Sequence, residues 1–249
     1  MGWGDEIMVT GVARRAQETN PLPVKVLDKK GQTRWHEIWT GNPRIASPAF
    51  AGPVQTITNG PGRRPYIERE TKERWIWREW DCPTGEIYLT PQERAFGTRY
   101  SGRVIIEPNL KPKASPNKDW GKPRWASLAR QLMDFGYAVA QLGEPSTPML
   151  AGVERIQTAG FREAAAVLAS AKLAILPEGG LHHAAAALGV PAIVIFGGYI
   201  SPRQTGYASH MNLFTGGIPC GMRIRCQHCA DAMNAILPEQ IVEHAVAFP

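Results

Sequence analysis

The chain has 249 residues, of which 43% are hydrophobic and 20% charged, with 25 glycines and 21 prolines; this composition is typical of a folded, water-soluble protein and excludes collagen, a coiled coil and intrinsic disorder. The formal net charge of +6 is diffuse, because residues 1–100 carry 15 Lys and Arg against 12 Asp and Glu and the remaining residues carry 13 against 10. A diffuse basic excess is compatible with three classes of binding partner: nucleic acid, an acidic membrane surface and a phosphorylated small molecule.

Residues 1–100 form the less regular part of the chain. We predict a helix over Glu6–Gln17 and strands over Val24–Leu27 and Glu86–Leu89, with many Gly, Pro and Trp residues between them. The segment Arg74–Trp80, RWIWREW, fits an amphipathic strand and a helix equally well.

From residue 103 onward, strand-type and helix-type periodicity alternate, as in βαβ units around a parallel sheet. A turn-rich stretch at residues 97–103 precedes this region. We therefore predict an α/β fold with one domain over residues 1–102 and a second over residues 103–249. The expected strands are Val104–Ile106, Tyr137–Leu142, Leu173–Leu176 and Ala192–Phe196, and the expected helices are Trp125–Phe135, Phe161–Ala171, Leu181–Leu188 and Pro238–Val246.

No transmembrane segment or signal peptide is expected. The longest weakly polar run, Ala184–Gly198, contains Gly189 and Pro191 and is shorter than the roughly 20 apolar residues that cross a bilayer. Asp5 and Glu6 stand where a signal peptide would be basic and then apolar. These features predict a cytoplasmic protein.

Two glycines, Gly179 and Gly180, lie between a predicted buried strand and an alanine-rich helix. Glycines at such a position let the backbone approach a ligand, and the first N–H groups of the helix face negative charge. Ligands of open α/β sheets bind at such carboxyl ends of strands. The segment predicts a phosphate site or, equally, an ordinary tight turn in which Glu178, His182 and His183 are solvated.

Two further segments carry charged candidates. In the loop Lys111–Trp125, Lys118 is placed to meet a diphosphate as a point charge, although a solvated basic loop is the simpler interpretation. At the start of the first helix, Asp5 is either a cap or a carboxylate presented to a substrate. Considered alone, it is better explained as a cap.

Taken in order, these segments resemble glycosyltransferase family 9, the ADP-heptose:lipopolysaccharide heptosyltransferases. The matching motifs are a Gly-Asp pair at 4–5, NKDW at 117–120, EGGLHH at 178–183 and LGVP at 188–191. Each motif is weak alone, whereas the ordered set is specific. The resemblance covers residues 103–249 well and residues 6–100 thinly.

The resemblance implies a GT-B architecture, in which two Rossmann-like domains with parallel sheets face a cleft. Residues 1–102, an abbreviated domain, would bind the acceptor, and residues 103–249 would bind the nucleotide sugar. It also implies an inverting transfer, without a metal or other required cofactor, from a nucleotide-diphosphate sugar such as ADP-heptose to an acceptor hydroxyl. Asp5 is then the general base, while Lys118 and the N–H groups of Gly179 and Gly180 stabilise the departing diphosphate.

The same resemblance assigns the remaining site residues. Glu178 stands where the family has Asp and would hold the donor sugar, and His183 matches the family's histidine, whereas His182 is extra. Glu144 loosely matches a carboxylate that holds the nucleoside. The family's strand before its Gly-Asp pair is represented here only by residues 1–3, so that strand is lost or Met1 is a late start. The acceptor and the oligomeric state are not carried over.

The four cysteines are too few and too unevenly spaced for a disulfide framework. Cys220, Cys226 and Cys229, with His228 between the last two, have the spacing of a zinc knuckle, and zinc needs four ligands. Because the spacing leaves the fourth ligand open, with Cys82 or His210 also available, we predict free thiols and no metal. The weaker alternative is a structural zinc on the first four residues.

Two other functions are compatible with the sequence. The diffuse positive charge and the short acceptor part fit the same transfer onto a modified nucleobase in DNA. A nucleotide-sugar or nucleic-acid binding module would keep the fold without turnover. Asp5 distinguishes them, because a binding module needs no base.

Overall fold

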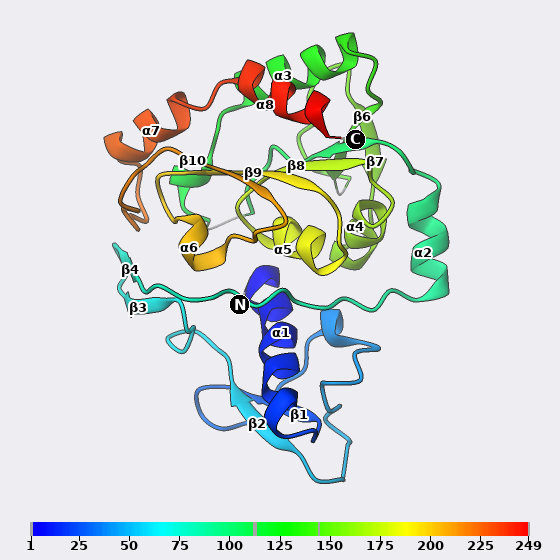
Figure 1. The fold of residues 1–249 in the computed structure, drawn as a ribbon, viewed down its shortest axis with the longest axis vertical. Helices are drawn as coiled ribbons and strands as arrows, with labels where there is room; N and C mark the ends of the chain where they lie inside the picture. The colour runs from blue at the N-terminus through cyan, green and yellow to red at the C-terminus, as the bar shows by residue number, and fades with distance from the viewer. Residues whose placement is uncertain (1, 112–113, 144, 249) are drawn as a thin grey trace.

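The computed structural model describes residues 2–111, 114–143 and 145–248, and a parallel sheet lies at its centre (Figure 1). Among these residues the sheet has six strands, in the order β10-β9-β8-β5-β6-β7, and every neighbouring pair is parallel. The strands are β5 (Val104–Ile106), β6 (Val139–Gly143), β7 (Glu154–Gln157), β8 (Leu173–Pro177), β9 (Ala192–Gly197) and β10 (Met211–Phe214). The predicted α/β class is confirmed.

Helices cover both faces of this sheet (Figure 1). One face carries α3 (Lys122–Asp134), α7 (Gln227–Asn234) and α8 (Pro238–Ala247), and the other carries α4 (Phe161–Leu168), α5 (Gly180–Ala187) and α6 (Pro202–Thr205). Along β8, Leu173 and Ile175 belong to the core under α3 and α8, while Ala174 and Leu176 belong to the core on the α5 side. Burial on both faces explains the continuous apolar runs of these strands.

The first 102 residues form smaller units. They comprise α1 (Trp3–Thr19), β1 (Val24–Leu27), the 3-10 turn η1 (Glu37–Trp39), β2 (Gln55–Thr58), β3 (Ile67–Glu70), β4 (Trp75–Trp77) and α2 (Pro91–Thr98). β1 and β2 pair in parallel, and β3 and β4 form an antiparallel hairpin. The hairpin resolves the ambiguity of Arg74–Trp80 in favour of a strand.

This N-terminal part packs onto the helices that cover one face of the large sheet. α1 lies against α5, and α2 lies against α4. At Gly97 of α2, an added Cβ would lie 1.9 Å from the carbonyl oxygen of Ala166 in α4, so only glycine permits this contact. Side chains from both regions, Ile7 and Leu176 among them, belong to one continuous apolar cluster.

The predicted strand Glu86–Leu89 is wrong. Within the described part of the chain, this segment pairs with no strand. Its backbone instead bonds to helix α1, where the Thr10 hydroxyl accepts from Glu86 N–H at 2.6 Å and lies 3.2 Å from the Glu86 carbonyl oxygen. The hydroxyl of Thr10 in α1 thus makes the backbone hydrogen bonds that a neighbouring strand would make if this alternating segment were part of a sheet.

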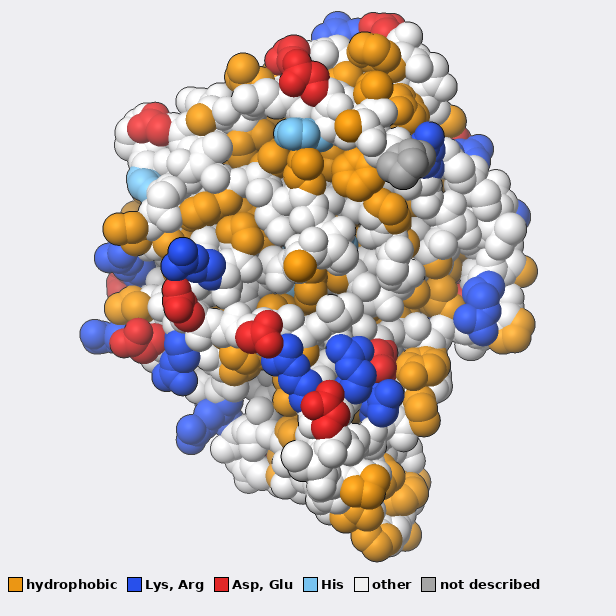
Figure 2. All heavy atoms as spheres, viewed as in Figure 1, with side chains coloured by type: hydrophobic (Ala, Val, Ile, Leu, Met, Phe, Trp, Pro, Cys, Tyr) orange, Lys and Arg blue, Asp and Glu red, His pale blue; other side chains and the backbone are white. Residues whose placement is uncertain are grey.

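The surface carries mixed charge. Figure 2 shows Lys and Arg side chains interspersed with Asp and Glu over the face viewed, rather than gathered into one basic patch. Exposed pairs such as Arg203 with Glu79, 2.8 Å apart, agree with the diffuse charge of the sequence. In the described ranges, no helix combines the length and the apolar character that a membrane span requires.

Candidate functional site

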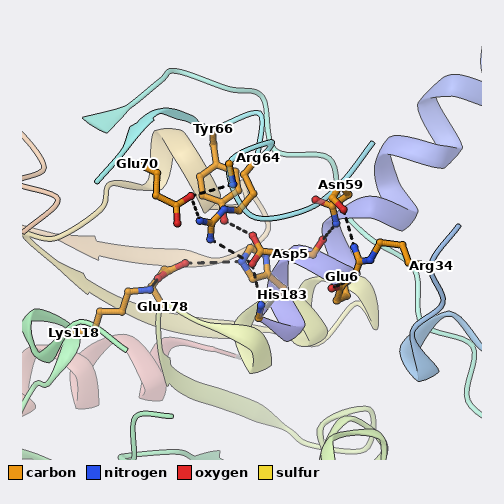
Figure 3. A network of polar contacts seen from close by, with 12 residues as sticks. Asp5, Glu6, Arg34, Asn59, Arg64, Tyr66, Glu70, Lys118, Glu178 and His183 are labelled. Atoms are coloured by element: carbon orange, nitrogen blue, oxygen red, sulfur yellow. Dashed lines mark hydrogen bonds and ion pairs between the residues drawn. The ribbon is translucent and has the colours of Figure 1, made fainter. Parts of the chain in front are cut away.

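The first turns of α1 and α5 meet at close range. A Cβ added at Gly4 would lie 2.3 Å from Cδ2 of His183, and one added at Gly180 would lie 2.9 Å from the Cβ of Trp3. The two glycines therefore permit the helices to touch. This contact carries Asp5, in the first turn of α1, to the carboxyl end of β8 (Figure 3).

Asp5 is only 9% exposed and uses both carboxylate oxygens. Oδ2 accepts a bond from Gly2 N–H at 3.1 Å and lies 3.8 Å from the guanidinium of Arg64, while Oδ1 accepts from the Tyr66 hydroxyl. Burial, and then the charge of Asp5, raise the pKa of Tyr66 well above its ordinary value, so the phenol stays a donor. Asp5 is thus a helix cap and also a fixed carboxylate.

Glu178 and Lys118 form an ion pair across the other side of the site (Figure 3). Lys118 ends the 3-10 turn η2 (Pro116–Lys118), and Glu178 directly follows β8 and is 6% exposed. The hydroxyl of Thr205 also donates to Glu178, at 3.2 Å. Burial opposes ionisation of Glu178, but Lys118 holds its pKa below the ordinary value.

His182 and His183 are buried and neutral, since burial lowers the pKa of both. Nε2 of His182 lies 2.8 Å from the Thr205 carbonyl oxygen, and Nδ1 lies 3.0 Å from the carbonyl oxygen and 3.2 Å from the N–H of Gly179. A proton on Nε2 satisfies Thr205 and leaves Nδ1 to accept from Gly179 N–H. Nδ1 of His183 bonds to the hydroxyl of Tyr207 at 2.6 Å.

These bonds change the predicted anion site. The N–H of Gly179, expected to meet phosphate, already binds His182, whereas those of Gly180 and Leu181 lie in the first turn of α5, where the helix itself supplies no acceptor. Ligand atoms of Glu178, His182 and His183 lie within 4.8 Å of one another, but both ring nitrogens of His182 are engaged. That trio is therefore a poor cation site.

Sequence reasoning missed two residues of the site. Arg64 and Tyr66 follow a loop-rich interval without periodicity, so no pattern pointed to them. The side chain of Lys111 also reaches the start of α1, where its Nζ would lie 2.7 Å from a Cβ at Gly2. The predicted nucleoside-binding residue Glu144 lies outside the described residues.

The sequence model of glycosyltransferase family 9 (heptosyltransferase) matches residues 104–232, more than half of the chain. The chain belongs to glycosyltransferase family 9. Lipopolysaccharide heptosyltransferase 2 of Escherichia coli (strain K12) is 33% identical to this family member over 159 residues, which cover 57% of this chain and 44% of that protein. The chain therefore spans less than half the length of this curated relative.

Solved structures of family 9 and related glycosyltransferases share the fold. The glycosyl transferase family 9 structure from Veillonella parvula DSM 2008 has a TM-score of 0.66 at 14% identity, covering 100% of this chain and 94% of that one. TibC from enterotoxigenic E. coli H10407, an iron-containing dodecameric glycosyltransferase, has a TM-score of 0.63 at 16% identity, covering 98% and 73%. The expected relation to GT-B enzymes of family 9 is confirmed.

The family 9 match contains one side of the site. Lys118 and the Glu178–His183 segment lie inside residues 104–232, whereas Asp5, Arg64 and Tyr66 precede them. The carboxylate that faces this segment therefore comes from the part of the chain that the family model does not match.

Gly4→Ala tests the contact between α1 and α5. The added methyl group would meet the ring of His183, which Tyr207 holds in place, so we expect a loss of about 1–3 kcal/mol from overpacking, larger than the ~1 kcal/mol gained in helix propensity. Urea unfolding measures the change. Gly160→Ala, where no atom lies within 4 Å of the added Cβ, is the control. Equal effects of the two substitutions would argue against a tight contact at Gly4.

Proposed function

We propose that this family 9 protein is a glycosyltransferase that moves a sugar from a nucleotide-diphosphate sugar, such as ADP-heptose, to an acceptor hydroxyl. Residues 103–249 bind the donor and residues 1–102 contribute to the acceptor side. One observation supports the proposal most directly: Asp5 and the Lys118–Glu178 ion pair lie in one site, at the carboxyl end of β8. The neighbouring proteins support this assignment, because the curated relative is named a heptosyltransferase.

The chemistry requires a base on one side of the sugar and positive charge on the other. Asp5 takes the proton of the acceptor hydroxyl as that oxygen bonds to the anomeric carbon, and the bond from this carbon to the diphosphate oxygen breaks. Because the acceptor oxygen attacks from the side opposite the diphosphate, the configuration of the anomeric carbon is inverted. Because Tyr66 and Gly2 bond to Asp5, its carboxylate is fixed before the acceptor arrives.

Cationic side chains of the chain itself stabilise the diphosphate. Lys118 lies at the site, and Lys111 and Arg64 flank it, so three cations surround the two carboxylates of Asp5 and Glu178. The N–H groups at the first turn of α5 add to this positive potential. Transfer therefore needs no metal at the reaction centre, and Glu178, once Lys118 turns to the diphosphate, is free to bind hydroxyls of the donor sugar.

We place this reaction in the cytoplasm, where nucleotide sugars are supplied, with a glycan as acceptor. Modified DNA is the competing acceptor, but the mixed charge of the face in Figure 2 offers no continuous basic track there. Steep loss of duplex-DNA binding with rising salt would reverse this preference.

A panel of ADP-, GDP- and UDP-sugars, with free ADP, tests donor binding by thermal shift. We expect ADP-heptose to raise the melting temperature in a concentration-dependent way, since a ligand that binds only the folded state stabilises it. Absence of a shift with every nucleotide sugar would contradict the proposal. A shift without transfer to any glycan or DNA acceptor would instead favour a binding module.

A further inference from the structure

Three cysteines and one histidine outside the proposed reaction site converge between β10 and α7. The ligand atoms of Cys220, Cys226, His228 and Cys229 all lie within 4.8 Å of one another. Sγ of Cys220 is 3.7 Å from that of Cys226 and 3.0 Å from that of Cys229, and Sγ of Cys229 is 3.8 Å from Nδ1 of His228. A tetrahedral ion with bonds of about 2.3 Å to sulfur and about 2.0 Å to nitrogen separates two sulfurs by roughly 3.8 Å and a sulfur from a nitrogen by roughly 3.5 Å. The Cys220–Cys226 and Cys229–His228 distances are therefore close to those of such a site, whereas the sulfurs of Cys220 and Cys229 would move apart to take the ion between them.

The local fold explains this convergence. Cys226 is the N-cap of α7 and Cys229 lies in its first turn, so the Cys-x2-Cys spacing directs both sulfurs to the helix N-terminus, where negative charge is favoured. Gly221, with a φ of +66°, turns the chain back just after Cys220. The N–H of Met222 donates to the Cys220 sulfur at 3.4 Å, a bond that stabilises a thiolate.

The orientation of His228 is an independent indication of a ligand site. Its Nε2 lies 2.7 Å from the carbonyl oxygen of Gly216, which only accepts, so Nε2 carries the proton. The ring nitrogen left to bind a cation is then Nδ1, which faces Cys229. Metal-binding histidines are characteristically held in this way by a carbonyl group on the opposite nitrogen.

We propose that Cys220, Cys226, His228 and Cys229 bind one thiophilic divalent cation, Zn²⁺ or Fe²⁺, in a closed structural site. Binding displaces the thiol protons, and four protein ligands leave no open position for a substrate. This geometry reverses the sequence-based preference for free thiols, because it supplies the fourth ligand that spacing alone left open. A cavity of about 290 Å³, lined in part by Cys226, Cys229 and Asn117, gives the cation a route to the cluster.

An ion bound at this site would also hold the loop that carries Lys118 in place. The side-chain amide of Asn117, the residue before Lys118, donates to the carbonyl oxygens of Met222 at 2.9 Å and Ile224 at 2.7 Å. Its oxygen accepts from Cys226 N–H at 3.1 Å. An ion that fixes the segment between Cys220 and Cys226 therefore fixes the turn η2 as well.

The same segment also holds the β3–β4 hairpin. Trp75 N–H donates to the carbonyl oxygen of Gly221 at 3.0 Å, and Nε of Arg74 donates to that of Cys220 at 2.7 Å. Figure 1 shows β4 and the segment that leads into α7 on the same side of the molecule. The cation is expected to join a part of residues 1–102 to the large sheet.

Elemental analysis of the full chain, purified under reducing conditions and then incubated with Zn²⁺ or Fe²⁺ and desalted, tests the proposal. We expect one zinc or iron per chain, loss of the metal in Cys226→Ser and His228→Ala, and its retention in His228→Cys, which restores four ligands. Cys82→Ala removes the cysteine outside the cluster and is the matched control, so it should keep the metal. Chelation of the wild type should lower its melting temperature, and the Cys82→Ala protein should respond in the same way.

Cobalt(II) gives a readout that needs no variant to fold. Bound to the wild-type chain, it should show the strong visible absorption of tetrahedral thiolate coordination, which Zn²⁺ then displaces. Wild-type protein without metal after this treatment would overturn the proposal, as would a disulfide between Cys220 and Cys229 in the reduced preparation. Equal metal content in the wild type and a folded Cys226→Ser variant would overturn it too.

Discussion

Asp5→Asn should lower the rate of sugar transfer by about 10²–10⁴-fold, the usual contribution of a general base, while leaving donor affinity nearly unchanged. The amide keeps the shape of the carboxylate: its oxygen can still accept from Gly2 N–H, while its nitrogen can donate to the Tyr66 hydroxyl, so the start of α1 should stay in place. It cannot take a proton from the acceptor hydroxyl. Transfer from ADP-heptose to a heptose-deficient lipopolysaccharide core, together with calorimetric titration of the donor, measures both quantities.

Glu18→Gln is the matched control for this experiment. Glu18 lies on the same helix, is exposed and is remote from the α1 start, so its substitution removes one negative charge without touching the site. Its transfer rate should equal that of the wild type. An Asp5→Asn protein that retains full activity would show that Asp5 is a structural cap, and the base would have to be sought elsewhere.

The large sheet could be predicted from the sequence because its central strands are buried on both faces. Every residue of Val104–Ile106 and Leu173–Leu176 is buried, so both appear as unbroken apolar runs between helices of regular period. Glycines then marked the helix ends, as at Gly136, whose positive φ of +87° ends α3. In this region the local sequence pattern and the buried environment therefore favour the same secondary structure.

The N-terminal part gave fewer such signals because tertiary contacts determine its structure. Glu86 has the alternation of a strand, yet its backbone bonds to the Thr10 hydroxyl. Arg64 and Tyr66 act on Asp5 across about 60 residues of chain, and no periodicity connects them. Likewise, the sequence offered Cys220, Cys226, His228 and Cys229 as candidate ligands, but only the folded chain shows that their ligand atoms lie within 4.8 Å of one another.

Lys118→Gln should reduce kcat/KM for the donor by about 10²–10³-fold, since it removes a cation aimed at the departing diphosphate. The substitution also leaves Glu178 buried without its ion-pair partner, at a cost on the order of 3 kcal/mol that protonation of Glu178 would limit. Lys122→Gln, an exposed lysine four residues away, is the matched control and should change neither quantity.

The double variant Lys118→Gln/Glu178→Gln separates the two losses. Removing both charges should recover most of the stability, but donor binding should stay weak because the diphosphate still lacks its cation. Recovery of donor affinity in the double variant would contradict a direct role for Lys118 and would indicate that it only neutralises Glu178. Thermal unfolding and titration with ADP, a probe that carries the diphosphate without the sugar, provide the two measurements.

The pH dependence of stability gives a further check on the same pair. Because Lys118 holds the pKa of Glu178 below its ordinary value despite burial, the pair stabilises the fold above the ordinary carboxyl pKa of about 4.3. That contribution is lost as the pH falls through the lower pKa of the folded state. The difference in unfolding free energy between the wild type and the double variant should therefore be constant near neutral pH and change only in acid, whereas Lys122→Gln should follow the wild type throughout.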